Sequence, residues 1–225
     1  MEYPKLKFAL NKNLDKKVVR DFLHDSKAGV NFGEERILQI HPEIRKMKSF
    51  AEIDKYIDEF YYYQSKLLYQ VAHDFQKCWQ KVEKDFFKLC DKQFNHLPWP
   101  KGKYIAYISM FNCGPRFLDN KTFQIFYWAQ TDSNFCIIHE MLHFQFYHYF
   151  HKKLKKYYKI DKEKIWELSE IFDSLVMWQD KDWKKLIYPI QFFVNYPDFA
   201  KTIENLKPFW LKHKSIPLLF KEYFK

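Results

Sequence analysis

The chain of 225 residues has few of the residues that make tight turns and cross-links, with only 4 Gly and 4 Cys. So few glycines argue against a fold of many short strands and tight turns, and they favour a mostly helical protein. The cysteines lack the short paired spacing of a structural zinc site, so we expect reduced thiols and a cytoplasmic protein. They are Cys78, Cys90, Cys113 and Cys136.

Long apolar runs are missing as well. No stretch approaches 18 uninterrupted apolar residues, so we expect no membrane span. Residues 1–17 have no apolar core of useful length and no small-residue cleavage site, so we expect no signal peptide. With 47% hydrophobic and 21% aromatic residues there is ample material for one core. We predict a single domain over 1–225, with a helical part at 1–97, a central part at 98–180 and short helices at 181–225.

The most informative motif is His-Glu-Met-Leu-His at residues 139–143, inside an apolar segment that reads as a helix. Residues four apart share one face of a helix, so His139 and His143 can present two imidazoles to one tetrahedral Zn²⁺ ion. Glu140 follows the first of them, where a carboxylate can take a proton from an attacking water and pass it to a leaving amine. The motif predicts a zinc-dependent hydrolase. The alternative is two core histidines satisfied by hydrogen bonds.

A catalytic zinc usually keeps three protein ligands, so a further His, Asp or Glu is needed. His148 and His151 continue the same helix, but they lie roughly 7 and 12 Å further along its axis, beyond reach of the same ion. Residues 161–180 supply a second predicted helix, with Asp161 as its cap. Of its carboxylates we favour Glu170 because its neighbours are apolar, and Glu167 is the alternative because it can pair with lysine in solvent.

The His-Glu-Met-Leu-His motif and the Ser-Glu-Ile-Phe-Asp run at 169–173 resemble the gluzincins, zinc metallopeptidases whose third ligand is a Glu on the helix after the motif helix. The chain length is similar to that of their small members, the minigluzincins. The resemblance covers roughly residues 103–180. It implies an α+β, mostly helical fold whose zincin-like core has a small antiparallel strand pair or sheet beside the motif helix.

The resemblance also implies a role for Asp173, as a carboxylate that orients His139 or His143 through the ring nitrogen that does not bind zinc. The sequence departs from the family here, because Asp173 follows Glu170 by three residues and the family spacing is four. The alternative is an ordinary carboxylate on the helix surface.

Two runs before the motif, 103–110 and 122–129, read as strands. The resemblance implies that the second is an edge strand that pairs with an extended substrate. Helices are expected at 14–25 and 33–40. A capping box of Ser49 and Glu52 opens a long helical pattern that runs to about residue 95 without Gly or Pro, as two helices or as one that projects.

Donors for the oxyanion of a tetrahedral intermediate are sought after the second ligand helix, where Tyr188, Tyr196 and His213 are candidates. The formal charge of +10 is concentrated in the run from His151 to Lys159. We read this run as a helix end and a solubilising surface rather than a nucleic-acid site, because no nucleic-acid module accompanies it.

We therefore predict a zinc-dependent peptidase that hydrolyses peptide bonds with Glu140 as general base, acting on a peptide or protein substrate. The first alternative is a catalytically silent binding or regulatory protein with a zincin fold. The second is a basic helical protein that binds nucleic acid, in which the motif is accidental. The sequence predicts no oligomeric state.

Overall fold

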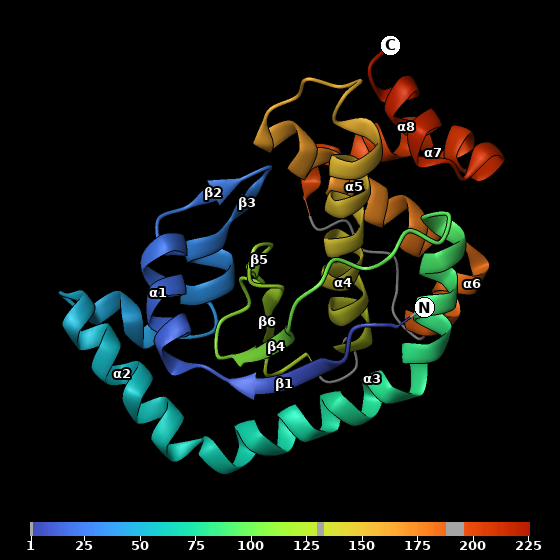
Figure 1. The fold of residues 1–225 in the computed structure, drawn as a ribbon. Coiled ribbons are helices and arrows are strands. Elements are labelled where there is room, and N and C mark those ends of the chain that lie inside the picture. Colours follow the sequence, from blue (N-terminus) through green and yellow to red (C-terminus); the bar gives the residue numbers. More distant parts are fainter. Residues whose placement is uncertain (1, 130–132, 188–195) are drawn as a thin grey trace. The chain divides into compact units, whose positions relative to one another are not determined.

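The computed structural model describes residues 2–129, 133–187 and 196–225. The protein is mostly helical with a small sheet, which agrees with the predicted α+β class (Figure 1). The helices are α1 (Lys12–Phe22), α2 (Phe50–Tyr63), α3 (Ser65–Gln93), α4 (Ser133–Tyr149), α5 (Lys162–Gln179), α6 (Lys181–Ile187), α7 (Ala200–His213) and α8 (Ile216–Tyr223). Short turns of π-helix, η1 (Phe32–Leu38) and η3 (Phe150–Leu154), and of 3-10 helix, η2 (Pro42–Lys46) and η4 (Pro197–Phe199), connect them. None of the helices in the described ranges is long and apolar enough to cross a membrane.

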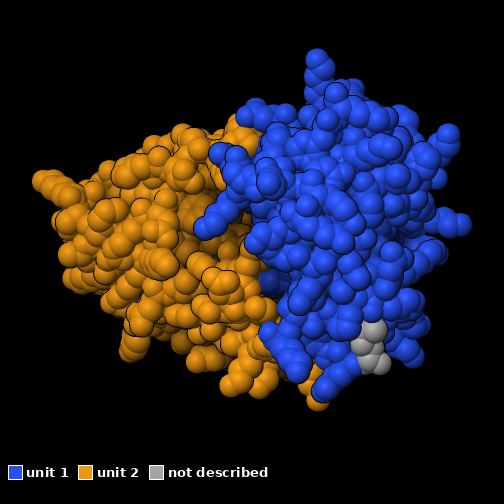
Figure 2. Space-filling view, turned by 45° about the horizontal axis from the view of Figure 1, so that its top comes forward, with its two compact units in different colours: residues 1–4, 80–101, 134–225 blue, residues 5–79, 102–133 orange. Residues whose placement is uncertain are grey.

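Two compact units make up the chain (Figure 2). The helical unit consists of Met1–Pro4, Gln80–Lys101 and Asn134–Lys225. The sheet unit consists of Lys5–Trp79 and Gly102–Ser133. The predicted single domain, with parts divided at residues 97 and 180, stays a prediction, because independent folding is a separate property from compactness.

The main sheet of the sheet unit has four strands in the order β1 (Leu6–Leu10), β4 (Tyr104–Ser109), β6 (Thr122–Phe126) and β5 (Arg116–Phe117). A separate hairpin pairs β2 (Ser26–Lys27) with β3 (Val30–Asn31). The two long predicted strands, β4 and β6, run parallel, so the predicted antiparallel pair is wrong. The cause is β5, which lies between them in sequence and takes the antiparallel hairpin position beside β6. The chain must therefore cross over before β6 can pair with β4.

The prediction of an edge strand at 122–129 is wrong for the first residues of this run. Strand β6 lies inside the sheet, with β4 along its whole length and β5 beside Thr122 and Phe123. The backbone N–H of Gln124 donates to the carbonyl of Pro115, at 3.0 Å, which occupies that side further. These partners leave the N-terminal half of β6 no free hydrogen-bonding edge for a substrate strand.

A buried carboxylate organises the end of this sheet. Asp15 of α1 is fully buried and accepts hydrogen bonds from the hydroxyls of Ser109 and Tyr61, at 2.5 and 2.7 Å, and from the side-chain amide of Gln124 at 2.8 Å. The backbone N–H of Met110 donates a fourth, at 3.0 Å. Four donors satisfy the carboxylate, so this buried group ties α1 and α2 to the end of β4 and to the middle of β6.

The long helical pattern from residue 49 to 95 is two helices, α2 and α3, that meet at Gln64. The predicted cap by Ser49 is confirmed at the start of α2, whereas Glu52 reaches back to Lys48 and not to Ser49 as a capping box would. The hydroxyl of Ser49 accepts from the N–H of Glu52 at 3.3 Å, and the Glu52 carboxylate accepts from the N–H of Lys48 at 3.0 Å. Both bonds satisfy amides near the helix start that have no intrahelical partner.

The core of the helical unit surrounds α4, which is buried over most of its length. Ile137, Ile138, Met141 and Leu142 have no exposed surface. Aromatic rings fill the space around the helix, and Phe146 lies 5.0 Å from Phe172 of α5 between ring centroids. A helix that is apolar on every side must be enclosed, so any polar side chain on it needs partners from neighbouring elements.

Candidate metal centre

The two histidines of the motif stand on α4 and face α5, which begins where the sequence predicts. The Asp161 carboxylate accepts from the N–H of Lys164, at 2.7 Å, and so caps α5. Early residues of α4 meet late residues of α5: Phe135 lies 5.5 Å from Trp178 between ring centroids, and His143 lies 3.4 Å from Glu170. The two helices therefore run antiparallel, and their facing sides hold the polar residues.

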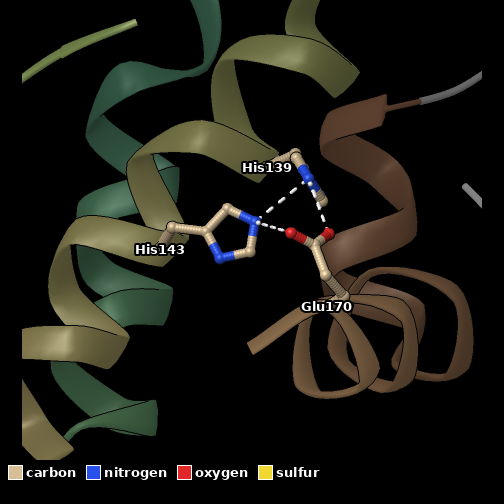
Figure 3. Close-up of side chains that lie close together, drawn as sticks. All are labelled: His139, His143 and Glu170. Carbon is tan, nitrogen blue, oxygen red and sulfur yellow. Dashed lines mark hydrogen bonds and ion pairs between the residues drawn. The ribbon is translucent and has the colours of Figure 1, made fainter. Parts of the chain in front are cut away.

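Three of these polar residues converge on one point: His139, His143 and Glu170 (Figure 3). The Nε2 atoms of the histidines are 3.1 Å apart. The two carboxylate oxygens of Glu170 lie 3.3 Å from Nε2 of His139 and 3.4 Å from Nε2 of His143. All three side chains are buried, with 8%, 0% and 3% of their residue surfaces exposed, so the group is enclosed by protein.

The spacing of these atoms fits a tetrahedral ion. Ligands about 2.0–2.2 Å from a tetrahedral zinc lie about 3.3–3.6 Å from one another. The three separations in the group, 3.1, 3.3 and 3.4 Å, are close to that range. Two imidazoles and one carboxylate are also ligands that zinc commonly takes. The group can therefore hold a metal ion.

The electrostatics of the group link metal binding to proton release. Burial alone would lower the pKa of His139, but the adjacent Glu170, with Glu140 and Asp173, raises it to about 9. Without a metal, His139 therefore carries a proton at neutral pH. A metal ion bound there would take the place of that proton, because a histidine ligand must be neutral at the coordinating nitrogen.

Asp173 lies against the same group, one turn of α5 beyond Glu170. Its Oδ2 is 3.4 Å from Nδ1 of His139, the ring nitrogen that points away from the group, and 3.3 Å from Nε2 of His143. The three-residue spacing that departs from the family thus still brings a carboxylate to His139. A carboxylate that accepted a hydrogen bond from Nδ1 would favour the tautomer that leaves Nε2 free to coordinate.

Glu140 lies at the edge of the group. Its Oε1 is 3.9 Å from Nε2 of His139, and 6% of its surface is exposed. A carboxylate at this distance is too far for a hydrogen bond to that nitrogen, but it is near enough to contact a water molecule between them. The placement is compatible with a proton-transfer role.

The alternative third ligand, Glu167, is used elsewhere. Its carboxylate accepts from Lys164 Nζ at 2.9 Å and from the hydroxyl of Tyr223 on α8. Between the two candidates, Glu170 belongs to the convergent group and Glu167 anchors α8 to α5. The two glutamates have different partners because residues three apart on a helix point in directions that differ by about 60° around its axis.

The other predicted residues lie apart from this group or outside the described residues. His148 is half-buried near the end of α4, and His151 is exposed in η3. Tyr188 lies outside the described residues. Tyr196 packs against Trp166 with ring centroids 4.9 Å apart, and His213 is exposed at the end of α7.

Two aromatic neighbours of the histidines were missed in the sequence. Phe135 stacks on His139, with ring centroids 6.0 Å apart, and Tyr147 lies 6.5 Å from His143. Each is four residues from its histidine, so the same spacing rule that selects the two histidines identifies them. The two aromatic residues lie on the same side of α4 as the histidines, one turn before His139 and one turn after His143.

Comparisons with known proteins give no match among family models, curated proteins or solved structures.

Proposed function

We propose that the protein is a zinc-dependent peptidase of the gluzincin type, which cleaves peptide bonds with Glu140 as general base. The observation that carries the proposal is the convergence of His139, His143 and Glu170 at separations that suit a tetrahedral ion. A chance pair of core histidines would not require a third, acidic ligand from a separate helix at the same point.

In this proposal the three convergent side chains hold zinc, and Asp173 orients His139 through Nδ1. When bound, zinc supplies a Lewis acid that polarises a peptide carbonyl and stabilises negative charge on its oxygen. Glu140 accepts a proton from water as the water attacks the carbonyl carbon, and it then delivers the proton to the leaving amine. The half-buried ring of Phe135 beside His139 provides an apolar wall near the reacting groups.

One observation favours the second candidate, a silent metal-binding protein. The ligands are nearly inaccessible, and Oδ2 of Asp173 lies only 3.3 Å from Nε2 of His143. A closed site with four protein ligands stabilises a fold without catalysis. In that case the metal would be bound as tightly as in the peptidase, but Asp173 rather than water would be the fourth ligand.

The two candidates are separated by elemental zinc analysis and a peptide-library cleavage assay on the wild-type protein and three variants. Glu140→Gln should retain one zinc and lose cleavage, because the amide cannot accept the proton. Glu163→Gln, an exposed change on α5, is the matched control and should alter neither quantity. Zinc in the wild-type, Glu140→Gln and Glu163→Gln proteins with cleavage by none would support the silent protein, provided that Asp173→Asn has a lower zinc affinity than the wild type. Absence of zinc from the wild-type protein would refute both candidates.

A further inference from the structure

The segment from Phe150 to Ile160 carries positive charge without any acidic residue. It contains five lysines, all exposed, and one exposed tyrosine. We call these six residues the lysine surface: Lys152, Lys153, Lys155, Lys156, Tyr157 and Lys159. All of them belong to the helical unit.

The lysine side chains face solvent because the apolar side chains of the same segment are packed against the protein. Phe150 and Tyr158 pack on Phe220 of α8, with ring centroids 5.8 and 5.2 Å apart, and Leu154 is buried. Because the apolar side chains of the segment face α8, the lysines between them must face solvent. The packing thus fixes the charged side chains on one outward face.

Their charge is not balanced locally. Elsewhere in the same unit lysines pair with carboxylates, as Lys164 does with Glu167 and Lys214 with Asp180. Within the described ranges, no carboxylate lies within ion-pair distance of any lysine of the lysine surface. Burial lowers the pKa of the nearby His151, and the positive charge of Lys155 lowers this pKa further. A cluster of like charges costs free energy that a negatively charged partner would recover.

Apolar groups stand at the border of the same surface. Tyr157 is 69% exposed, and Phe224, 40% exposed, stacks on the neighbouring Tyr158 with ring centroids 5.4 Å apart. Large apolar side chains beside lysines suit the boundary between lipid headgroups and acyl chains. There one end of an aromatic ring contacts water and the other contacts hydrocarbon.

We propose that the lysine surface binds the headgroups of anionic phospholipids, with Tyr157 and Phe224 entering the interface. The surface contains lysines and no arginine. This composition suits general electrostatic attraction to a charged membrane, whereas individual phosphates are usually recognised by the two-pronged hydrogen bonds of an arginine guanidinium. The bordering Phe224 has no role in a contact with a phosphodiester backbone. A role in ending the helix does not account for Lys159, because the helical turn η3 ends at Leu154 and the helix dipole acts only within the last turn.

The experiment is sedimentation of the full chain with vesicles of phosphatidylcholine, with and without about a third phosphatidylserine. We expect binding only to the phosphatidylserine vesicles, and loss of binding as salt rises from about 0.1 to 1 M. Changing Lys152, Lys153, Lys155 and Lys156 to Gln should weaken binding by about fivefold per lysine, so by more than about a hundredfold together. Tyr157→Ser should weaken binding further at equal charge.

The matched control carries Lys81→Gln, Lys84→Gln, Lys181→Gln and Lys184→Gln, four exposed positions of the same unit with the same change in net charge. It should bind almost as the wild type does. Equal losses in the two quadruple variants, equal binding to neutral vesicles, or no binding at all would overturn the proposal. So would wild-type protein that ignores vesicles but binds an oligouridylate through the same four lysines, since the surface would then be a nucleic-acid site. The assay involves no metal, so its failure leaves the peptidase proposal untouched.

Discussion

Zinc should raise the thermal unfolding temperature of the protein, and Glu170 should account for a measurable share of that rise. A ligand that binds only the folded state at about 1,000 times its Kd stabilises that state by about 4.1 kcal/mol. For a chain of 225 residues, each kcal/mol shifts the midpoint by about 2–4 °C. Zinc at that concentration should therefore raise the unfolding midpoint of the protein by about 8–16 °C.

Glu170→Gln removes one ligand oxygen and the charge next to His139, where the two side chains are 3.3 Å apart. Losses of tenfold or more in metal affinity are expected even for groups that only support a ligand. At the same zinc concentration a tenfold loss removes about 1.4 kcal/mol of the stabilisation, or about 3–6 °C of the shift. The variant also changes the metal-free protein, so the quantity to compare is the shift on adding zinc, measured for each protein by calorimetry.

Glu167→Gln is the matched control, on the same helix with the same chemical change. It breaks contacts with Lys164 and Tyr223 and should lower the midpoint with and without zinc by the same amount. Equal zinc-dependent shifts in wild type and Glu170→Gln would refute the ligand assignment. A reduced shift in Glu167→Gln alone would transfer the role to that residue.

Three further predictions concern the sheet unit. Asp15→Ala leaves four buried donors without their acceptor and should lower the unfolding free energy in urea by about 3–5 kcal/mol; a loss below about 1 kcal/mol would contradict the described network. Burial raises the pKa of Asp15 above 3.8 although its four hydrogen bonds lower it, so the folded state holds this proton more tightly. The contribution of Asp15 to the unfolding free energy is therefore fully present below about pH 3.8 and is lost as the pH rises through the raised pKa. Asp15→Asn should lack this pH dependence when the unfolding free energy is measured across the acid range. In Gly33→Ala a Cβ would lie 1.8 Å from the carbonyl oxygen of Leu23, so we expect a loss of at least about 3 kcal/mol, and wild-type stability would show that the close approach is wrong.

The sequence predicts those features of the fold that depend on local spacing. The caps at Ser49 and Asp161 follow from short hydrogen-bond patterns, and the facing of His139 and His143 follows from the helical repeat. Glu170 was selected because its neighbours are apolar, and the structure buries it. In each case the information lies within a few residues of the feature.

Features set by distant partners could not be predicted in this way. The alternation of a strand does not encode the direction of its neighbour, and β5, with two residues, is too short to recognise by pattern. Strand β1 was missed because its place in the sheet depends on β4, about 100 residues later. The network of Asp15 joins residues separated by 46 to 109 positions, so a single Asp in α1 shows none of its partners in sequence.

The helical unit recruits residues from the beginning of the chain, since Tyr3 stacks on Phe87 at 4.5 Å and donates to the carboxylate of Asp91 at 2.6 Å. The chain passes between the two units four times, after residues 4, 79, 101 and 133, and one of these passages lies within α3. No continuous stretch of the gene therefore encodes either unit. During synthesis on a ribosome the core of the helical unit is complete only after Phe220 of α8 has been added. Truncated fragments are consequently poor tools for isolating the metal group, and point substitutions in the full chain are the appropriate way to study it.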